Sequence, residues 1–409
     1  MYTEISKCRI SQSTNLITVL SLGEQYLTGV FPKRVDEKVT KGPLDLVWCP
    51  ESGLLQMKQS YSLEEMYGDN YGYRSGLNAS MVRHLEHKIK TLERMVNLND
   101  TDLVIDIGSN DATSLKAYSG KHRKIGIDPT GLKFKEFYTD TITLIPEFFS
   151  EKTFHANFPG KKAKIITSIA MFYDLESPMN FVRDIEQCLA DDGIWHFEQS
   201  YMPSMLRTNS YDTICHEHLE FYSLKVVKSI LEQCGLQVID VQMNSINGGS
   251  FAVTASKKRS QFVPNRPIIE WLLQQESDMG LDNPKPYREF EERVFRHRKN
   301  LTSLIEALVA DGKKIIGYGA STKGNVLLQF CGLTSKHIPF IAEVNKDKFG
   351  SFTPGTHIPI ISEAEAKAMN PDYFLVLPWH FKDNILSREK EYSAKGGKFI
   401  FPLPEIEII

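Results

Sequence analysis

The chain has 409 residues, a net charge of -3 and an isoelectric point near 6.4. This length predicts two or three domains, and the charge balance provides no basic field for nucleic acid. No apolar run is long enough to span a membrane, and residues 1–10 lack the apolar stretch of a signal peptide. Six cysteines at irregular spacing do not indicate a disulfide framework, so we expect a cytoplasmic protein.

Residues 1–65 read as strands separated by glycine and proline turns. Two segments in this region each resemble half of a C-x-x-C zinc motif, but both end in serine: Cys8 precedes Ser11, and Cys49 precedes Ser52. A serine hydroxyl is a poor zinc ligand, and no histidine lies in this region to replace it. We therefore expect free thiols and no bound zinc.

Residues 66–255 alternate short apolar runs with helical patterns, which is typical of a parallel sheet covered on both faces. The expected buried strands are 102–108, 124–128, 164–170 and 193–199.

The loop after the first of these strands, Asp106-Ile107-Gly108-Ser109-Asn110-Asp111-Ala112, suits a nucleotide-like ligand, and Asp128-Pro129 follows the second strand. A dinucleotide site needs G-x-G-x-x-G beneath a pyrophosphate, whereas this loop has one glycine and two acids, which would repel a phosphate. S-adenosylmethionine carries no phosphate and is cationic, so the loop favours that cofactor. The alternative is an ordinary tight turn in another α/β fold.

Two histidines flank a glutamate in His216-Glu217-His218, within YDTICHEHLEFYS (211–223). On a helix these histidines would point to nearly opposite sides, and on a strand no third ligand is evident nearby, so a zinc hydrolase is disfavoured. A histidine moves protons readily near neutral pH, and Glu217, Tyr211 and Tyr222 are candidates to orient it or stabilise charge. Spacing alone does not separate this hypothesis from a polar loop that hydrogen-bonds itself.

Residues 256–312 are rich in charged residues and helix formers, and 287–312 predicts one long helix ending at Gly312. Residues 313–409 restart the strand–helix alternation. The expected strands are 313–319, 338–344 and 372–378.

The loop 317–325, GYGASTKGN, follows the first strand of this last region and opens a helix. Backbone N–H groups with Ser321, Thr322 and Lys323 would form an anion cradle at a helix N-terminus. The spacing fits neither a P-loop nor a dinucleotide fingerprint. We favour a pyrophosphate-bearing substrate here, with a plain turn or a nicotinamide site as alternatives.

Taken together, the motifs resemble those of S-adenosylmethionine-dependent C-methyltransferases that act on nucleotide-linked 4-keto-6-deoxyhexoses. The resemblance covers nearly the whole chain. It is carried by YGYRSG (71–76), DIGSND (106–111), GIDP (126–129), FYDLESP (172–178), YDTICHEHLEFYSL (211–224), NGGS (247–250), GYGASTKGN (317–325) and PGTHIPI (354–360).

The resemblance implies an α/β protein with a central Rossmann-like class I methyltransferase domain. A small N-terminal β-rich module, in the family a zinc module, and a C-terminal second Rossmann-like domain for the sugar nucleotide flank it. The implied limits are 1–65 for the module, 66–255 for the methyltransferase domain, 256–312 for a helical linker and 313–409 for the C-terminal domain.

The family pattern also implies roles for individual residues. The implied catalytic residues are His218, Glu217, Tyr73, Tyr71, Tyr173 and His216. The implied cofactor-binding residues are Asp106, Gly108, Asn110, Asp111, Asp128, Pro129 and Ala170. The implied substrate-binding residues are Tyr222, Asn247, Gly319, Ser321, Lys323, Asn325, Glu343 and His357.

By this resemblance, His218 removes the proton at C3 beside the keto group, a tyrosine hydroxyl bonds the enolate oxygen, and no metal is needed. The chain departs from the family at Ser11 and Ser52, at Cys215, where some members have tyrosine, and at Tyr173, where some have histidine. The other hypotheses are a sugar O- or N-methyltransferase, a nicotinamide-dependent oxidoreductase and a non-catalytic sugar-nucleotide sensor.

Overall fold

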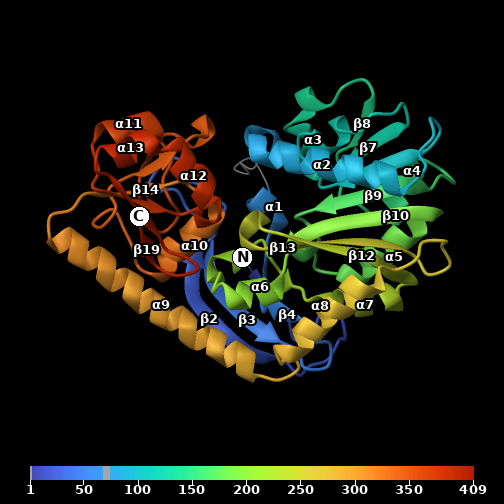
Figure 1. Ribbon diagram of the computed structural model, residues 1–409, viewed down its shortest axis with the longest axis horizontal. Coiled ribbons are helices and arrows are strands. Elements are labelled where there is room, and N and C mark those ends of the chain that lie inside the picture. The colour runs from blue at the N-terminus through green and yellow to red at the C-terminus, as the bar shows by residue number, and fades with distance from the viewer. Residues whose placement is uncertain (1, 68–73) are drawn as a thin grey trace.

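Two α/β units and a smaller antiparallel module form the molecule, and the computed structural model describes residues 2–67 and 74–409. Figure 1 shows the central unit, cyan to yellow, on one side and the C-terminal unit, orange to red, on the other. The N-terminal strands β2 and β3, in blue, run along the lower edge between them.

The central sheet has seven strands in the order β12-β13-β10-β9-β6-β7-β8. Its strands are β6 (Leu103–Ile107), β7 (Arg123–Ile127), β8 (Ile142–Ile145), β9 (Ala163–Ile169), β10 (Leu189–Ser200), β12 (Leu236–Asn244) and β13 (Ser250–Lys257). The five from β8 to β10 are parallel, and β13 and β12 extend the sheet antiparallel at one edge. Every residue of β6 is buried because helices cover both faces of the sheet. The predicted parallel sheet is confirmed.

Short and medium helices connect the central strands. They are α2 (Ala79–Met95), α3 (Thr113–Lys116), α4 (Glu151–Asn157), α5 (Pro178–Cys188), α6 (Met202–Arg207), α7 (Leu224–Gln233) and α8 (Arg266–Asp278). The N-cap of α2 is Asn78, whose side chain accepts a hydrogen bond from the backbone N–H of Ser80. Leu85, Ile89 and Leu92 form the buried stripe of that helix, at the spacing of one helical face.

The C-terminal sheet has six strands in the order β16-β15-β14-β17-β18-β19, and its first five strands are arranged as in the central sheet. Its strands are β14 (Ile315–Tyr318), β15 (Ile341–Glu343), β16 (Ile360–Ser362), β17 (Tyr373–Val376), β18 (Lys398–Phe401) and β19 (Glu407–Ile408). Its helices are α10 (Thr322–Phe330), α11 (Glu363–Ala368), α12 (Lys382–Arg388) and α13 (Lys390–Ala394). In both sheets the first strand lies between the second and the fourth, so each sheet has a switch point where ligands bind beyond the strand ends.

The N-terminal module has two antiparallel sheets, β1-β5 and β11-β4-β3-β2, and the second sheet includes a strand from the central region. The module contains β1 (Tyr2–Glu4), β2 (Ile17–Tyr26), β3 (Lys41–Trp48), β4 (Leu55–Met57), β5 (Gln59–Tyr61) and the short helix α1 (Leu63–Tyr67). The strand from the central region, β11 (Glu220–Phe221), pairs with β4. The module therefore cannot separate from the central unit without breaking a sheet.

The long helix α9 (Lys285–Ala310) matches the predicted helix closely, and Gly312 follows it with a φ of 74°. One face of α9 is buried, and the ring of Tyr287 lies 5.1 Å from that of Trp48 in β3. This face shares one apolar core with β2, β3 and the C-terminal sheet. Among the described residues, no helix is both long and apolar enough to cross a membrane.

The buried carboxylate of Glu276 ties α8 to the start of α7. Its Oε1 accepts hydrogen bonds from the Tyr201 hydroxyl (2.7 Å) and the Leu224 N–H (2.5 Å), and its Oε2 accepts one from the Lys225 N–H (2.9 Å). We expect Glu276→Ala to lower the free energy of unfolding by about 3 kcal/mol, because buried donors lose their acceptor. Thermal melts measure the loss. Glu270→Ala, at an exposed position of the same helix, should leave the melting temperature unchanged.

Candidate active site

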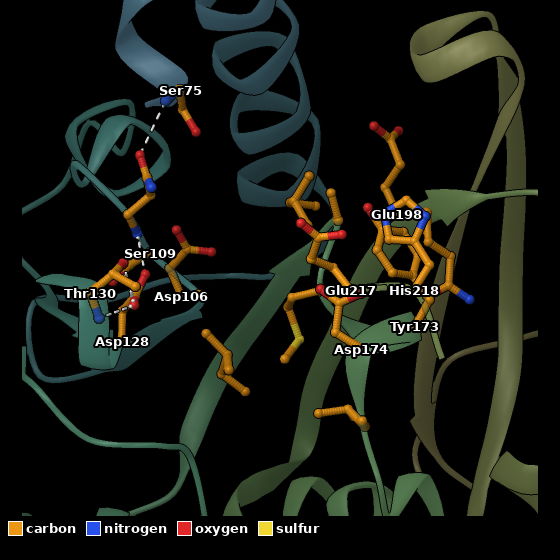
Figure 2. A pocket seen from close by; sticks show the side chains of 18 of the residues that line it. Ser75, Asp106, Ser109, Asp128, Thr130, Tyr173, Asp174, Glu198, Glu217 and His218 are labelled. Atoms are coloured by element: carbon orange, nitrogen blue, oxygen red, sulfur yellow. Dashed lines mark hydrogen bonds between the residues drawn. The ribbon is translucent and has the colours of Figure 1, made fainter. Parts of the chain in front are cut away.

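A cavity of about 460 Å³ lies beyond the carboxyl ends of β6, β7, β9 and β10. Figure 2 shows two groups of side chains facing each other across it: Asp106, Ser109, Asp128 and Thr130 on one side, and Tyr173, Glu198, Glu217 and His218 on the other. Residues of the C-terminal unit, Thr322 and Lys323, complete the lining. The switch point of the central sheet therefore opens toward the C-terminal unit.

Asp106 is the last residue but one of β6, and it is almost fully buried. Its Oδ1 accepts a hydrogen bond of 2.6 Å from the Thr167 hydroxyl. Burial raises the pKa of Asp106 to about 7, and the nearby charge of Asp128 adds to this rise. A bound cation would lower the pKa of Asp106 and favour its ionised form.

The loop after β6 is fixed by the carboxylate of Asp128. Its Oδ2 accepts from the N–H of Asn110 (2.7 Å), and its Oδ1 accepts from the N–H and hydroxyl of Thr130, both at 2.7 Å. Gly108 has a φ of 69°, and a Cβ there would lie 3.3 Å from Cγ of Met171. Asp106, Gly108, Asn110, Asp128, Pro129 and Ala170, all predicted to bind the cofactor, line the cavity.

Asp111 was also predicted to bind the cofactor, but its carboxylate points toward residues 74–76. Its Oδ2 accepts a hydrogen bond of 2.9 Å from the N–H of Gly76 and lies 3.6 Å from Nε of Arg74. Asp111 therefore holds residues 74–77 against the loop and does not line the cavity.

His218 lines the cavity with one ring nitrogen already engaged. Its Nδ1 lies 2.8 Å from the carbonyl oxygen of Thr213, which fixes the proton on Nδ1 and leaves Nε2 as the acceptor. Its ring lies 4.3 Å from that of Tyr173, which also lines the cavity. Burial and the charge of Lys323 lower the pKa of His218 to about 3, so the ring is neutral at physiological pH.

Glu217 is held against the N-terminal module. A Cβ on Gly29 would overlap Oε1 of Glu217, so a larger residue there would displace this carboxyl. Its Oε2 is buried and has no hydrogen-bond partner among the described residues. Burial raises the pKa of Glu217, which favours a protonated carboxyl that can donate to a ligand.

His216, the other histidine of the pair, does not line the cavity. Its Nδ1 lies 3.2 Å from the Thr28 hydroxyl, and its ring packs edge-on against Tyr61 at 4.6 Å. Burial lowers its pKa to about 3. His216 and Glu217 lie in a turn, so the two histidines do not face the same side, and these contacts place His216 at the interface with the N-terminal module.

Of the residues predicted to bind substrate, Asn247 and Lys323 line the cavity. The ring of Tyr222 stacks on Phe172 at 5.1 Å inside the core, and His357 is exposed just after a turn. The remaining predicted positions lie in the loop after β14, at the start of α10 and at the end of β15: Gly319, Ser321, Asn325 and Glu343. Tyr71 and Tyr73 lie outside the described residues.

The predicted anion cradle after β14 uses most of its polar groups internally. The N–H of Ala320 donates to Oε2 of Glu343 at 2.7 Å, and the Ser321 hydroxyl caps α10 by accepting from the N–H of Gly324 at 3.0 Å. Asn325 donates to the carbonyl of Thr28 at 2.7 Å. A Cβ on Gly319 would lie 2.7 Å from Cδ of Pro378. The loop thus supports the fold, and Lys323 carries its charge into the cavity.

Glu198 was not predicted from the sequence; it lies near the end of β10, within WHFEQSY, and lines the cavity. Its carboxylate lies 2.6 Å from Nε2 of His84, from Nζ of Lys88 and from Nδ2 of Asn244. Burial opposes ionisation, but His84 and Lys88 together lower the pKa of Glu198. An acidic residue near the end of a predicted buried strand was the one feature of the sequence that could have indicated Glu198. Nothing in the sequence indicated that its partners His84 and Lys88, on α2, would contact it.

The four positions of the split cysteine motif do converge in space. The Cys8 thiol lies 3.2 Å from the Ser52 hydroxyl, and the Cys49 thiol lies 3.5 Å from the Ser11 hydroxyl. The described chain holds no group of three or more histidine, cysteine, aspartate or glutamate side chains placed to bind a metal ion. Two thiols and two hydroxyls do not fit zinc, which prefers thiolate or imidazole ligands.

Three family models match the chain. "Putative zinc binding domain" matches residues 8–67, "Methyltransferase domain" matches 81–241, and "C-methyltransferase C-terminal domain" matches 245–404. A relative, C-methyltransferase NovU from Streptomyces niveus, is 31% identical over 410 residues, covering 99% of this chain and 97% of its own.

Two solved methyltransferase structures show remote similarity to this chain. A chain of the complex between the Haloferax volcanii Trm112 methyltransferase activator and a methyltransferase is 13% identical, with a TM-score of 0.37 over 44% of this chain and 94% of its own. The mitomycin 7-O-methyltransferase MmcR is 15% identical, with a TM-score of 0.35 over 44% of this chain and 55% of its own. Likenesses this remote carry no argument about the site.

The titration of Asp106 predicts a pH dependence for cofactor binding. A cationic cofactor favours the carboxylate, so its binding requires loss of the proton that Asp106 holds below a pKa of about 7. We expect S-adenosylmethionine to bind roughly tenfold more weakly at pH 6 than at pH 8, because each pH unit below the pKa costs a factor of ten. Isothermal titration calorimetry measures this slope.

Asp106→Asn is the matched control, because it keeps the shape of the side chain and cannot titrate. Its affinity should be lower and should lose this part of the slope, whereas titration of the ligand itself affects both proteins alike. An identical pH profile in the two proteins would exclude Asp106 as the titrating group.

The serine positions predict how metal binding could be restored. The purified protein should contain no stoichiometric zinc, whereas Ser11→Cys with Ser52→Cys should bind about one zinc ion per chain through four thiolates. Elemental analysis by mass spectrometry measures both contents. Zinc at full occupancy in the unaltered protein would contradict the expectation.

Proposed function

The chain belongs to the family of S-adenosylmethionine-dependent C-methyltransferases, and we propose that it methylates a nucleotide-linked 4-keto-6-deoxy sugar at C3 through an enolate. The family membership rests on the relative in Streptomyces niveus, which matches this chain almost end to end. The sugar substrate, the position of methylation and the catalytic base are the proposed part.

The observation that carries the proposal is a neutral histidine placed in the same cavity as an acidic, single-glycine loop. His218 offers Nε2 as a proton acceptor, and the acids Asp106 and Asp128 face it across the cavity (Figure 2). A C-methyltransferase needs both groups, because a carbon acid has to lose its proton beside the methyl donor. Methyl transfer to an oxygen or nitrogen lone pair requires no carbon acid.

The chemical groups of the loop after β6 and of Asp128 are suited to binding S-adenosylmethionine. Asp106 and Asp128 are acceptors suited to an ammonium group and ribose hydroxyls, and Gly108 leaves the backbone open to close approach. When bound, S-adenosylmethionine supplies an electrophilic methyl group. The protein's task is then to hold the substrate carbon near that methyl and to exclude water.

The remaining steps belong to the side chains around His218. The C3–H bond breaks, its proton moves to Nε2 of His218, and the electron pair delocalises onto the neighbouring keto oxygen. The hydrogen bond from Nδ1 to the Thr213 carbonyl holds the ring in the accepting tautomer and stabilises it once it is charged. Burial raises the pKa of Glu217, which favours the protonated carboxyl that would donate a hydrogen bond to the sugar.

The substrate class is tested by incubating the protein with S-adenosylmethionine and a panel of TDP-, GDP- and CDP-linked 4-keto-6-deoxyhexoses. Mass spectrometry should detect one added methyl group in a member of the panel, and NMR should place that methyl on C3. A methyl on oxygen or nitrogen would favour the alternative methyltransferase. Reduction of the keto group with NADH would favour an oxidoreductase.

We expect His218→Ala to bind S-adenosylmethionine like the unaltered protein and to lose about 10²–10⁴-fold in methyl transfer, the usual contribution of a positioned general base. Single-turnover kinetics measure the loss, and calorimetry measures cofactor affinity. His87→Ala, at an exposed position on α2, is the matched control and should keep full activity. Normal turnover by His218→Ala would exclude His218 as the base.

A further inference from the structure

The side chain of Lys323 lies in the cavity beside the proposed base, a position that the predicted anion-binding loop does not account for. Lys323 is the second residue of α10, and it lines the cavity together with His218 and Glu217. Part of the cradle is already engaged, because the N–H of Ala320 donates to the carboxylate of Glu343 and the Ser321 hydroxyl caps α10. The Lys323 side chain is the charged group that this loop brings to the cavity.

The ammonium group of Lys323 keeps donors for a ligand. Its Nζ donates to the carbonyl of Asn247 at 2.9 Å, and an ammonium has three N–H groups, so two remain. Lys323 lies in the first turn of α10, a nine-residue helix, so the positive end of the helix dipole lies at the same place. This position concentrates positive charge at the end of the cavity that holds the proposed base.

A neighbouring carboxylate acts on the charge of Lys323. Burial lowers the pKa of Lys323, but the buried carboxylate of Asp212 opposes that effect. Oδ2 of Asp212 accepts a hydrogen bond of 2.8 Å from Nε1 of Trp379, which fixes the counter-charge. The charge of Lys323 adds to burial in lowering the pKa values of His218 and His380, so it acts on the base itself.

The chemistry of the proposed substrate decides which of its oxygens Lys323 meets. In a hexose ring C1, which carries the nucleoside diphosphate, lies opposite C4, which carries the keto group. A base that reaches the proton on C3 is next to C4 and remote from the phosphates. A cation beside that base therefore meets the keto oxygen.

We propose that Lys323 is a catalytic residue that donates a hydrogen bond from Nζ to the keto oxygen and stabilises the enolate oxygen formed when His218 removes the neighbouring proton. The C–H bond breaks, the proton goes to Nε2 of His218, and the electron pair moves to the oxygen facing the ammonium. This inference rests on the proposed function. It assigns the oxyanion site to the C-terminal unit, so that catalysis requires both α/β units.

The test is exchange of the C3 proton in deuterated water without S-adenosylmethionine, using a keto-sugar nucleotide that the unaltered protein methylates. At saturating sugar nucleotide, Lys323→Met should slow exchange by about 10²–10³-fold, the usual loss on removing one oxyanion donor. Lys323→Arg should recover part of the rate. Lys314→Met, at an exposed position before β14, is the control and should exchange normally.

Two further readouts separate this role from phosphate binding and from a damaged fold. S-adenosylmethionine affinity should be unchanged in Lys323→Met, because Asp106 and Asp128 lie across the cavity. The pKa of His218, followed by NMR, should rise in that variant because a neighbouring positive charge is removed. A raised KM for the sugar nucleotide with unchanged saturated exchange would assign Lys323 to the phosphates and overturn the inference.

The outcomes also separate this inference from the proposed function. If the unaltered protein exchanges no proton of any keto sugar, the proposed function fails and the role of Lys323 falls with it. If the unaltered protein exchanges and Lys323→Met exchanges equally fast, only the role of Lys323 is wrong.

Discussion

The arrangement of the site depends on how one segment, residues 211–221, is anchored from three sides. Tyr211 lies 3.1 Å from His297 of α9, and Asp212 accepts from Trp379 of the C-terminal unit. At its other end the segment becomes β11 and pairs with β4 of the N-terminal module. Because three partners over-determine its path, His218 and Glu217 are held in the cavity without belonging to a helix or strand of their own.

This anchoring explains why a small N-terminal module matters to chemistry that takes place between two larger units. Thr28 bonds both His216 and Asn325, so one residue of the module links the HEH segment to α10. Gly29 leaves room for the carboxyl of Glu217. The module therefore sets the distance between the base and Lys323. A shift in the module would change the spacing of the groups that face the substrate, even though its cysteines and serines lie in another part of the molecule.

The parallel sheets and the acidic loop could be predicted from sequence, because buried strands and the turns after them have local signals. The confirmed features, such as β6 and α9, depend on residues near one another in the chain. No local sequence pattern indicates which way a side chain points in an irregular segment. Asp111 and His216 stand beside cavity residues in the sequence but face the neighbouring segments 74–77 and Thr28. Glu198 was missed because its partners His84 and Lys88 come from a helix more than a hundred residues earlier.

The charges in the cavity match the two ends of a methyl transfer to carbon. Asp106 and Asp128 place negative charge where a cationic methyl donor is to be held, and Lys323 places positive charge where an enolate is to form. A site with a single sign of charge would stabilise one partner and repel the other in a medium of low dielectric constant. The two α/β units provide both signs of charge, because the loops at the carboxyl ends of both sheets line one cavity. One contributes the acids and the other the lysine, and the anchored histidine lies between them.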